Sequence, residues 1–342
     1  MAETNLLETY KEAGLDPALT DPVLTEILEG KTISPDAIRN KKSWTVDELL
    51  STEFPEPNWA IPGIVPEGLT ILGGRPKKGK SFLALQMSIA IATGGMFFDR
   101  KIDQGEVLYY ALEDNPRRLK DRLNKMGVKL GTPITFLHNL SPLHEGGISE
   151  LYMNIKLDRF RFIVVDTLAK ASRGIDQNKQ GIMSRVWPDI QSTAINHNVP
   201  LKFIDHTRKP MGFNVDPIDD IIASTIKTGA ADAVLAIYTE PGKAGAKLLG
   251  RGREMEDVEL RIHWDPLTFC FQCDGNANEI QLTESKQEVI DTLNDLGKCQ
   301  LNDIANTLGK DRSNIYRTLV DLVNDGKVRK EPISNKVYYE KR

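Results

Sequence analysis

The segment Ile71–Phe82, ILGGRPKKGKSF, contains the residue types of a phosphate-binding loop. Within it, Gly74–Ser81 matches the pattern G-x-x-x-x-G-K-[ST]. Glycines let backbone N–H groups point at a phosphate, and the following helix adds its dipole. We expect Lys80 to reach the β- and γ-phosphates of ATP and Ser81 to ligate Mg²⁺. The predicted cofactor site comprises Gly74, Arg75, Pro76, Lys77, Lys78, Gly79, Lys80, Ser81 and Phe82, with the side chains of Lys77 and Lys78 in solvent.

Two carboxylates that follow apolar strands could complete this site. Asp166 ends FRFIVVD, the usual position of a second group that holds the Mg²⁺ of such a loop. Glu113 ends EVLYYALE and could polarise the attacking water, provided that it lies beside Asp166. Asp114 competes for this role, or else caps the helix that starts near Pro116.

His206 ends a third apolar strand, LKFIDH. A polar group at that position could contact the γ-phosphate and report its loss to the segment that follows. The alternative is a strand-end histidine with only a structural role. Without the phosphate loop and the strand-end carboxylates, the structural role of His206 would be the preferred interpretation.

These residues require a sheet that brings several strand ends together. Apolar strands are expected near residues 69–72, 106–112, 161–166 and 201–206, with helices near 81–93, 116–126 and 186–198 between them. Continuous apolar strands separated by helices indicate an α/β fold with a mainly parallel sheet covered on both faces. Further strands near residues 231–238, 245–252, 258–264 and 268–272 lack intervening helices and predict an antiparallel extension.

Three segments are expected along the 342 residues. Residues 1–50 form short amphipathic helices, residues 51–280 the core with the phosphate loop, and residues 283–342 a separate module. A proline-rich stretch at 53–68 predicts an extended connector. The last module shows helical patterns at 284–297, 301–309 and 312–326, then two strands, which is typical of a winged helix-turn-helix.

Several motifs together resemble the RepA-like, hexameric replicative-helicase branch of the RecA-like ATPases. The resemblance covers about residues 44–272, and its motifs are VPEGLTILGGRPKKGKSFLALQMSIAIA, VLYYALEDNPRRLKDRL, FIVVDTLAK, HTRK, TGAADAVLAI and GRGREMEDVEL. It implies a RecA-like P-loop ATPase in which Glu113 is the catalytic carboxylate and Asp166 the Walker B residue. His206 becomes the γ-phosphate sensor, although Asp205 stands where relatives often have another histidine.

The resemblance also implies contacts beyond the subunit. Arg251 and Arg253 correspond to a basic pair offered to the nucleotide of a neighbouring subunit, and strand alternation would place both on one face. RecA-like rings bind single strands through two loops, here residues 169–185 and 207–224. Their candidate phosphate contacts are Lys170, Arg173, Lys179, Arg208 and Lys209.

The C-terminal module could bind DNA or protein. Arg312, Asn314 and Arg317 lie at the start of its expected recognition helix, where base or phosphate contacts are usual. Residues 283–342 contain eleven Lys and Arg against ten Asp and Glu, a balance that also suits docking to protein.

The resemblance therefore implies an ATP- and Mg²⁺-dependent, ring-forming and hexameric DNA helicase that moves on single-stranded DNA. Replication of a plasmid, phage or integrated element, with a primase or initiator as partner, is the expected setting. The alternative is an ATP-switched DNA-binding, loading or recombination protein that does not unwind.

Location and cysteine content give weaker indications. The acidic N-terminus and the lack of a long apolar run indicate a cytoplasmic protein without a membrane partner. The net charge of −4 does not decide whether nucleic acid is bound. Cys270 and Cys273 form a CxxC, but residues i and i+3 of a strand face opposite sides, which disfavours a metal site.

Overall fold

The computed structural model describes residues 43–54, 56–174, 180–206, 230–239, 245–334 and 336–342. Two of the expected N-terminal helices, at residues 4–14 and 22–30, lie outside this part of the chain. The third is α5, Val46–Ser51. Thr45 accepts a hydrogen bond from Glu48 N–H, and the Glu48 carboxylate accepts one from Thr45 N–H, so a capping box starts this helix.

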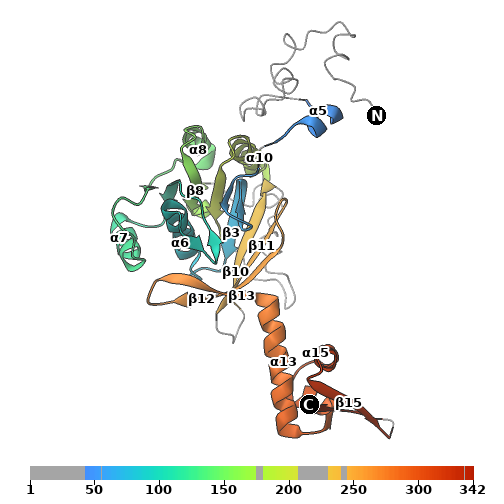
Figure 1. Ribbon diagram of the computed structural model, residues 1–342. Coiled ribbons are helices and arrows are strands. Elements are labelled where there is room, and N and C mark those ends of the chain that lie inside the picture. The colour runs from blue at the N-terminus through green and yellow to red at the C-terminus, as the bar shows by residue number, and fades with distance from the viewer. Residues whose placement is uncertain (1–42, 55, 175–179, 207–229, 240–244, 335) are drawn as a thin grey trace. The chain divides into compact units, whose positions relative to one another are not determined.

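The described chain divides into two compact units (Figure 1). The first contains the described residues up to Leu235 together with Arg251–Glu256, and the second contains Ala236–Gly250 and Asp257–Arg342. The hydrogen-bonded order of the large sheet is β13-β12-β11-β10-β3-β9-β8-β6-β7. The fold is therefore α/β, as the alternation of strands and helices predicts.

Parallel strands form the part of the sheet that carries the strand-end residues. β3, β9, β8, β6 and β7 run parallel to one another. Their bounds are Gly68–Gly74, Pro200–Ile204, Phe160–Asp166, Glu106–Ala111 and Ile134–Leu137. The edge strand β7 was not expected, because four residues give too short a pattern to distinguish a strand from a loop. The other four were predicted, and their carboxyl ends meet at one edge.

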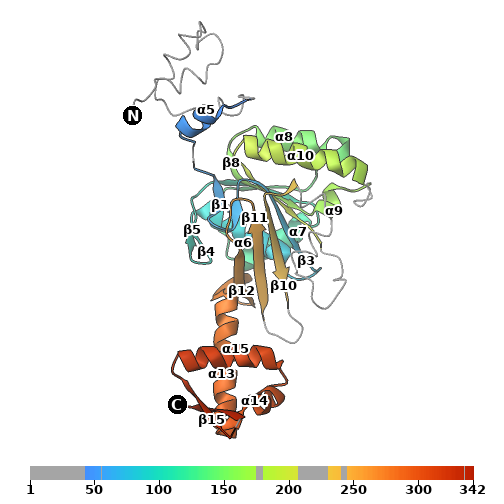
Figure 2. The ribbon, with the colours of Figure 1, turned by 90° about the vertical axis from the view of Figure 1, so that its right-hand side faces the viewer.

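Helices cover both faces of these strands. On one face, α6 (Lys80–Thr93) packs against β3, β6 and β8. On the other, α8 (Gly147–Ile155) and α10 (Gln180–Asn196) lie side by side, as Figure 2 shows. The core between the sheet and these two helices includes Tyr110 of β6, Val165 of β8 and Phe203 of β9. Alternate residues of a strand face the same side of the sheet. α7, Pro116–Lys125, follows β6.

Short elements complete the first unit and correct two expectations. The proline-rich stretch is not simply extended: β1 (Trp59–Ile61) and β2 (Val65–Pro66) form a hairpin, because the chain turns at Pro62–Ile64. The expected long loop at 169–185 contains α9 (Leu168–Ala171) and the start of α10. The remaining elements are β4 (Met96–Phe97), β5 (Arg100–Lys101) and the 3-10 helix η1 (Leu143–Glu145).

Antiparallel strands follow β10 (Ala233–Tyr238), as the absence of helices between them predicts. β11 (Ala246–Gly252), β12 (Val258–Asp265) and β13 (Cys270–Asn276) pair in sequence. α13 begins at Ala277 and runs to Leu296, so it starts seven residues before the expected position. The Asn276 side chain accepts hydrogen bonds from the N–H groups of Asn278 and Glu279, which starts the helix directly after β13. α13 therefore continues across the boundary expected at residues 280–283.

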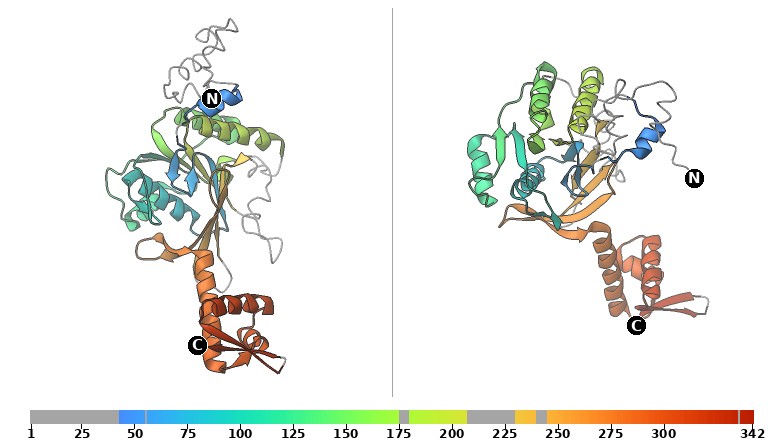
Figure 3. Two further views of the ribbon diagram at one scale, coloured as in Figure 1. Left: turned by 45° about the vertical axis from the view of Figure 1, so that its right-hand side comes forward. Right: turned by 45° about the horizontal axis from the view of Figure 1, so that its top comes forward.

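Two further helices and three strands follow α13. They are α14 (Leu301–Leu308), α15 (Arg312–Asn324), β14 (Cys299–Gln300), β15 (Val328–Ile333) and β16 (Lys336–Lys341). Of these, α14, α15 and β16 pack against α13. β15 and β16 form the expected hairpin, and the short β14 was not expected. Figure 3 shows this hairpin next to α15. The module has its own core, which includes Leu293, Ile304 and Leu319.

No helix in the described ranges is long and apolar enough to cross a bilayer.

Candidate nucleotide site

The predicted phosphate loop joins the end of β3 to the start of α6. β3 is buried along its whole length, whereas Arg75, Pro76, Lys77 and Lys78 are exposed. Gly79 precedes the helix with φ of 86°, a left-handed conformation that side chains other than glycine rarely adopt. The N-terminal N–H groups of α6 thus open toward the loop, which is the arrangement that binds a phosphate. Gly74 ends β3, and Lys80, Ser81 and Phe82 begin α6.

Lys80 is a buried cation held by oxygen atoms of its own loop. Its Nζ donates to the carbonyl oxygens of Gly74 at 2.7 Å and Arg75 at 3.0 Å, and it lies 3.1 Å from His206 Nδ1. Burial lowers the pKa of Lys80 to about 8, although the charges of Asp166, Asp205 and Glu113 oppose this shift. A phosphate group would supply the negative charge that these neutral carbonyls lack. The site is therefore electrostatically suited to an anion.

Asp166 ends β8 and faces the same region. Burial raises the pKa of this carboxyl to about 6, while hydrogen bonding to Ser81 and Tyr109 lowers it. Tyr109 donates to Asp166 Oδ2 at 2.8 Å. The other oxygen, Oδ1, is buried and makes no hydrogen bond of ordinary geometry with the described residues.

A hard cation next to Ser81 would satisfy this oxygen. Mg²⁺ prefers carboxylate and hydroxyl oxygens, and it keeps several waters of its own. Ser81 and Asp166 offer those two ligand types at the start of α6 and at the end of β8. These residues fit the Mg²⁺ that the loop implies.

Glu113 lies beside the Asp166 strand end, as its proposed role requires. Ala111 pairs with Asp166 in the β6–β8 register, which places Glu113 next to Thr167. Thr167 Oγ1 donates to Glu113 Oε1 at 2.7 Å. His206 Nε2 lies 4.0 Å from the same oxygen.

His206 therefore stands between Lys80 and Glu113. Its N–H donates to its neighbour Asp205 Oδ1 at 2.8 Å, which fixes the backbone just after β9. Burial and the nearby Lys80 charge lower the pKa of His206. A neutral imidazole could accept from Lys80 or donate toward a γ-phosphate. The structure thus brings Lys80, Ser81, Glu113, Asp166 and His206 together.

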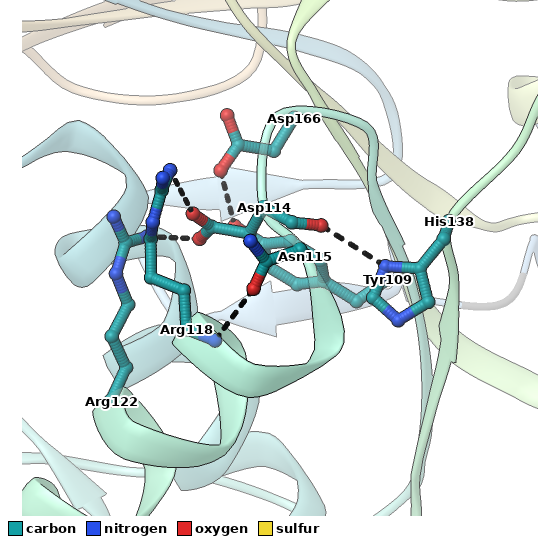
Figure 4. A network of polar contacts seen from close by, with 7 residues as sticks. All are labelled: Tyr109, Asp114, Asn115, Arg118, Arg122, His138 and Asp166. Carbon is teal, nitrogen blue, oxygen red and sulfur yellow. Dashed lines mark hydrogen bonds and ion pairs between the residues drawn. The ribbon is translucent and has the colours of Figure 1, made fainter.

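Asp114 does not cap α7. Asn115 is the capping residue and accepts from Arg118 N–H, as Figure 4 shows. The Asp114 carboxylate instead pairs with Arg118 at 3.3 Å and with Arg122. Two arginines on α7 occupy Asp114, which favours Glu113 as the residue free to act on water.

Phe82, in the first turn of α6, contacts one of these two arginines. The Arg122 guanidinium lies 4.8 Å from the Phe82 ring centre, which is cation–π distance. α7 is thereby fixed to the start of α6. Within EVLYYALED, Tyr109 has the pattern of a core residue, and Thr167 carries no sequence signal at all.

The remaining predicted site residues lie elsewhere. Arg251 lies in β11, but Arg253 follows the end of that strand, so strand alternation does not place the two on one face. Lys170 and Arg173 are exposed in and after α9. Lys179, Arg208 and Lys209 lie outside the described residues. Arg312, Asn314 and Arg317 are exposed on α15.

One comparison with known proteins, the family model, agrees with this geometry. A family model described as an AAA domain, AAA_25, matches residues 34–212, slightly more than half of the chain. A crystal structure of a KaiC-like protein from Pyrococcus horikoshii is 15% identical, covers 63% of this chain and 93% of its own, and has a TM-score of 0.45. No curated protein in the comparison matched.

The family match includes the phosphate loop, Glu113, Asp166 and His206, and it ends before Arg251. Those four features are the ones that the structure gathers around the start of α6. The chain belongs to the AAA_25 family of AAA-domain proteins and is a P-loop ATPase.

Proposed function

We propose that this ATPase is a RecA-like motor that assembles as a hexameric ring, hydrolyses ATP between subunits and unwinds duplex DNA by moving along one strand. The observation that carries the proposal is the position of Arg253. Its N–H donates to the Asp232 carbonyl at 2.9 Å, and Asp232 N–H donates to the Leu69 carbonyl at 2.8 Å. Arg253 is therefore next to the first residues of β3.

The phosphate loop lies at the other end of the same strand. From Leu69 to Gly74 a strand advances about 17 Å, at about 3.3 Å per residue. An arginine next to Leu69 is thus separated from its own ATP site by most of the length of β3. Arg251 and Arg253 suit a role at the nucleotide of a neighbouring subunit instead, which agrees with the resemblance to ring helicases.

In the proposed site, Lys80 and Ser81 hold the nucleotide, and Asp166 and Ser81 hold its Mg²⁺. The metal would neutralise phosphate charge when bound. Glu113, oriented by Thr167, accepts a proton from the attacking water. Arg251 and Arg253 of a neighbour would stabilise the transition-state charge, an effect worth about 10³–10⁵ in rate.

His206 is proposed to link hydrolysis to DNA. It stands against both Lys80 and Glu113, and it is followed by residues 207–224, the second proposed DNA-binding segment. Loss of the γ-phosphate would change the contacts of His206, which would report that loss to the segment that follows it. Lys170, Arg173, Lys179, Arg208 and Lys209 are the proposed phosphate contacts.

We infer that residues 283–342 form a winged helix that binds DNA. α15 would be the recognition helix, with Arg312, Asn314 and Arg317 exposed at its N-terminal half. Three lysines of the module are paired with acids, Lys286 with Asp325, Lys298 with Glu331 and Lys310 with Glu288. The cations of α15 and of the hairpin are thus the ones offered to a nucleic acid. Binding of a primase or initiator by this module is the alternative.

ATP turnover with and without single-stranded DNA, measured on wild type and Arg253→Ala, tests the proposal. We expect DNA to stimulate turnover and Arg253→Ala to abolish the stimulated rate, while the particle mass with MgATP stays that of a ring. A monomer whose turnover ignores DNA would overturn it.

A strand-displacement assay separates the motor from its rival. A ring with DNA-stimulated turnover that displaces no strand would be an ATP-switched DNA-binding or loading protein.

A further inference from the structure

We propose that Asp232 is a positioning residue for Arg253, which it holds in place for the nucleotide of the neighbouring subunit. This inference rests on the proposed function, in which Arg253 acts across the subunit interface. Asp232 lies directly before β10 and was not singled out in the sequence, where it is one carboxylate among many.

Asp232 contacts Arg253 through both its backbone and its side chain. Its carbonyl accepts the Arg253 N–H at 2.9 Å, and its carboxylate Oδ1 lies 3.8 Å from Arg253 Nη1. The Asp232 side chain is 13% exposed, whereas that of Arg253 is 57% exposed. Arg253 is thus held at its backbone by the Asp232 carbonyl and faced at its guanidinium by the largely buried Asp232 carboxylate, so it is preorganised and still accessible.

The carboxylate is itself fixed by two donors from other elements. Leu69 N–H donates to Oδ2 at 2.8 Å, and Gln191 Nε2 donates to Oδ1 at 2.7 Å. The approach is close: a Cβ on Gly68 would lie 2.3 Å from Asp232 Oδ2. Glycine at position 68 thus leaves the space that this carboxylate occupies. The Arg253 anchor is built from β3, α10 and the residue before β10.

Other charges around this anchor are also negative. Burial raises the pKa of the nearby Glu67, and the charges of Glu254 and Asp232 raise it further. Arg253 is therefore a cation in an acidic neighbourhood, with Asp232 as an ion-pair partner.

The arrangement connects two ATP sites through one strand. β3 carries the Asp232–Arg253 anchor at its first residues and the chain's own phosphate loop at its last. A displacement of β3 when nucleotide binds would move the arginine offered to the neighbour. Asp232 is the residue through which that movement reaches Arg253.

Asp232→Asn tests the proposal with little change of shape. The Asn oxygen can still accept from Leu69 N–H, and the Gln191 amide can reverse to accept from the new NH₂ group. The negative charge that faces Arg253 is what disappears. We expect DNA-stimulated kcat to fall about tenfold, with the melting temperature and ring mass unchanged, and the double variant Asp232→Asn/Arg253→Ala to be no slower than Arg253→Ala alone.

Mixing subunits identifies where the effect acts. Lys80→Ala subunits cannot hydrolyse ATP but carry an intact Arg253. Added to Asp232→Asn rings, they should raise turnover per Asp232→Asn subunit, because intact arginines then reach working sites. Arg253→Ala rings mixed with Lys80→Ala subunits are the matched control.

The outcomes are distinguishable. If Arg253→Ala keeps wild-type turnover, or if its rings gain nothing from Lys80→Ala subunits, the trans-acting arginine and the proposed function fail. A second set of outcomes concerns Asp232 alone. If the Arg253 results hold but Asp232→Asn turns over like wild type or gains nothing on mixing, the positioning role of Asp232 is wrong and the proposed function stands. The same conclusion follows if Asp232→Asn slows the Arg253→Ala variant further.

Discussion

Tyr109 donates a 2.8 Å hydrogen bond to Asp166 Oδ2, across the pairing of β6 with β8. The tyrosine is fully buried, and burial raises its pKa well above the ordinary value, so that its hydroxyl keeps its proton at neutral pH. One carboxylate oxygen of Asp166, Oδ2, therefore already accepts a hydrogen bond. The other, Oδ1, is left for a ligand at the start of α6.

Tyr109→Phe should weaken Mg²⁺ binding rather than remove it, because Asp166 would lose the bond that orients it. We expect the Mg²⁺ concentration for half-maximal turnover to rise by roughly three- to tenfold. The hydrogen bond from Tyr109 lowers the pKa of Asp166, so its loss should also move the acidic limb of the pH–turnover profile to higher pH.

Tyr110→Phe is the matched control for this change. Tyr110 is equally buried on the same strand, and its hydroxyl accepts from Asn154 on α8 instead. Its loss should leave the Mg²⁺ dependence as in wild type. Equal effects of the two variants would contradict a role of Tyr109 at Asp166.

Glu113→Gln should stop hydrolysis while ATP binding remains. The amide oxygen can still accept from Thr167, but it cannot take a proton from water. A general base contributes about 10²–10⁴ in rate, which sets the expected loss of kcat. Binding of a fluorescent ATP analogue should be within a few-fold of wild type.

Glu106→Gln, at the exposed start of β6, the strand that Glu113 follows, should retain full turnover. Turnover by Glu113→Gln near the wild-type rate would transfer the role of base to another group in the site.

Lys202→Met should stabilise the protein. Lys202 is completely buried on β9, with Nζ 2.6 Å from Met87 Sδ and 5.4 Å from the centre of the Phe162 ring, and it takes part in none of the ion pairs of the described residues. Burial lowers its pKa from 10.5 to about 7. At pH 7 and below the folded state therefore carries the full cost of a buried cation.

The stabilisation gained by Lys202→Met should depend on pH. Between pH 7 and about 10.5 the unfolded lysine binds more protons than the folded one, so the Lys202 contribution to stability rises with pH. The gain from Lys202→Met should be largest at pH 6–7, roughly 5 °C or more in melting temperature, and should shrink toward pH 10. Lys120→Met, at an exposed position of α7, is the control and should change little. A wild type that melts higher than Lys202→Met at pH 6 would contradict the prediction.

The local parts of the site were predictable from the sequence. The phosphate loop is one continuous stretch whose glycine, lysine and serine fix both its conformation and its chemistry. Asp166 and Glu113 could be found because apolar strands end at or just before them. Their proximity followed from parallel strands whose carboxyl ends meet at one edge.

Residues that act through distant pairing could not be found in this way. Tyr109 has the pattern of a core residue, and its contact with Asp166 depends on a register between segments 57 positions apart. Arg253 was expected on the strand face of Arg251, but the strand ends at Gly252, where Arg253 N–H bonds to Asp232. The early start of α13 depends on a single capping side chain, Asn276.

The early start of α13 determines where the C-terminal module can be separated from the sheet. α13 begins at the residue after β13 and supplies Val289 and Leu293 to the C-terminal core, with no interruption over its 20 residues. It is one helix about 30 Å long, continuous from Ala277 to Leu296. A cut at residue 283 would divide this helix within its first two turns. The C-terminal module is therefore better separated before Ala277.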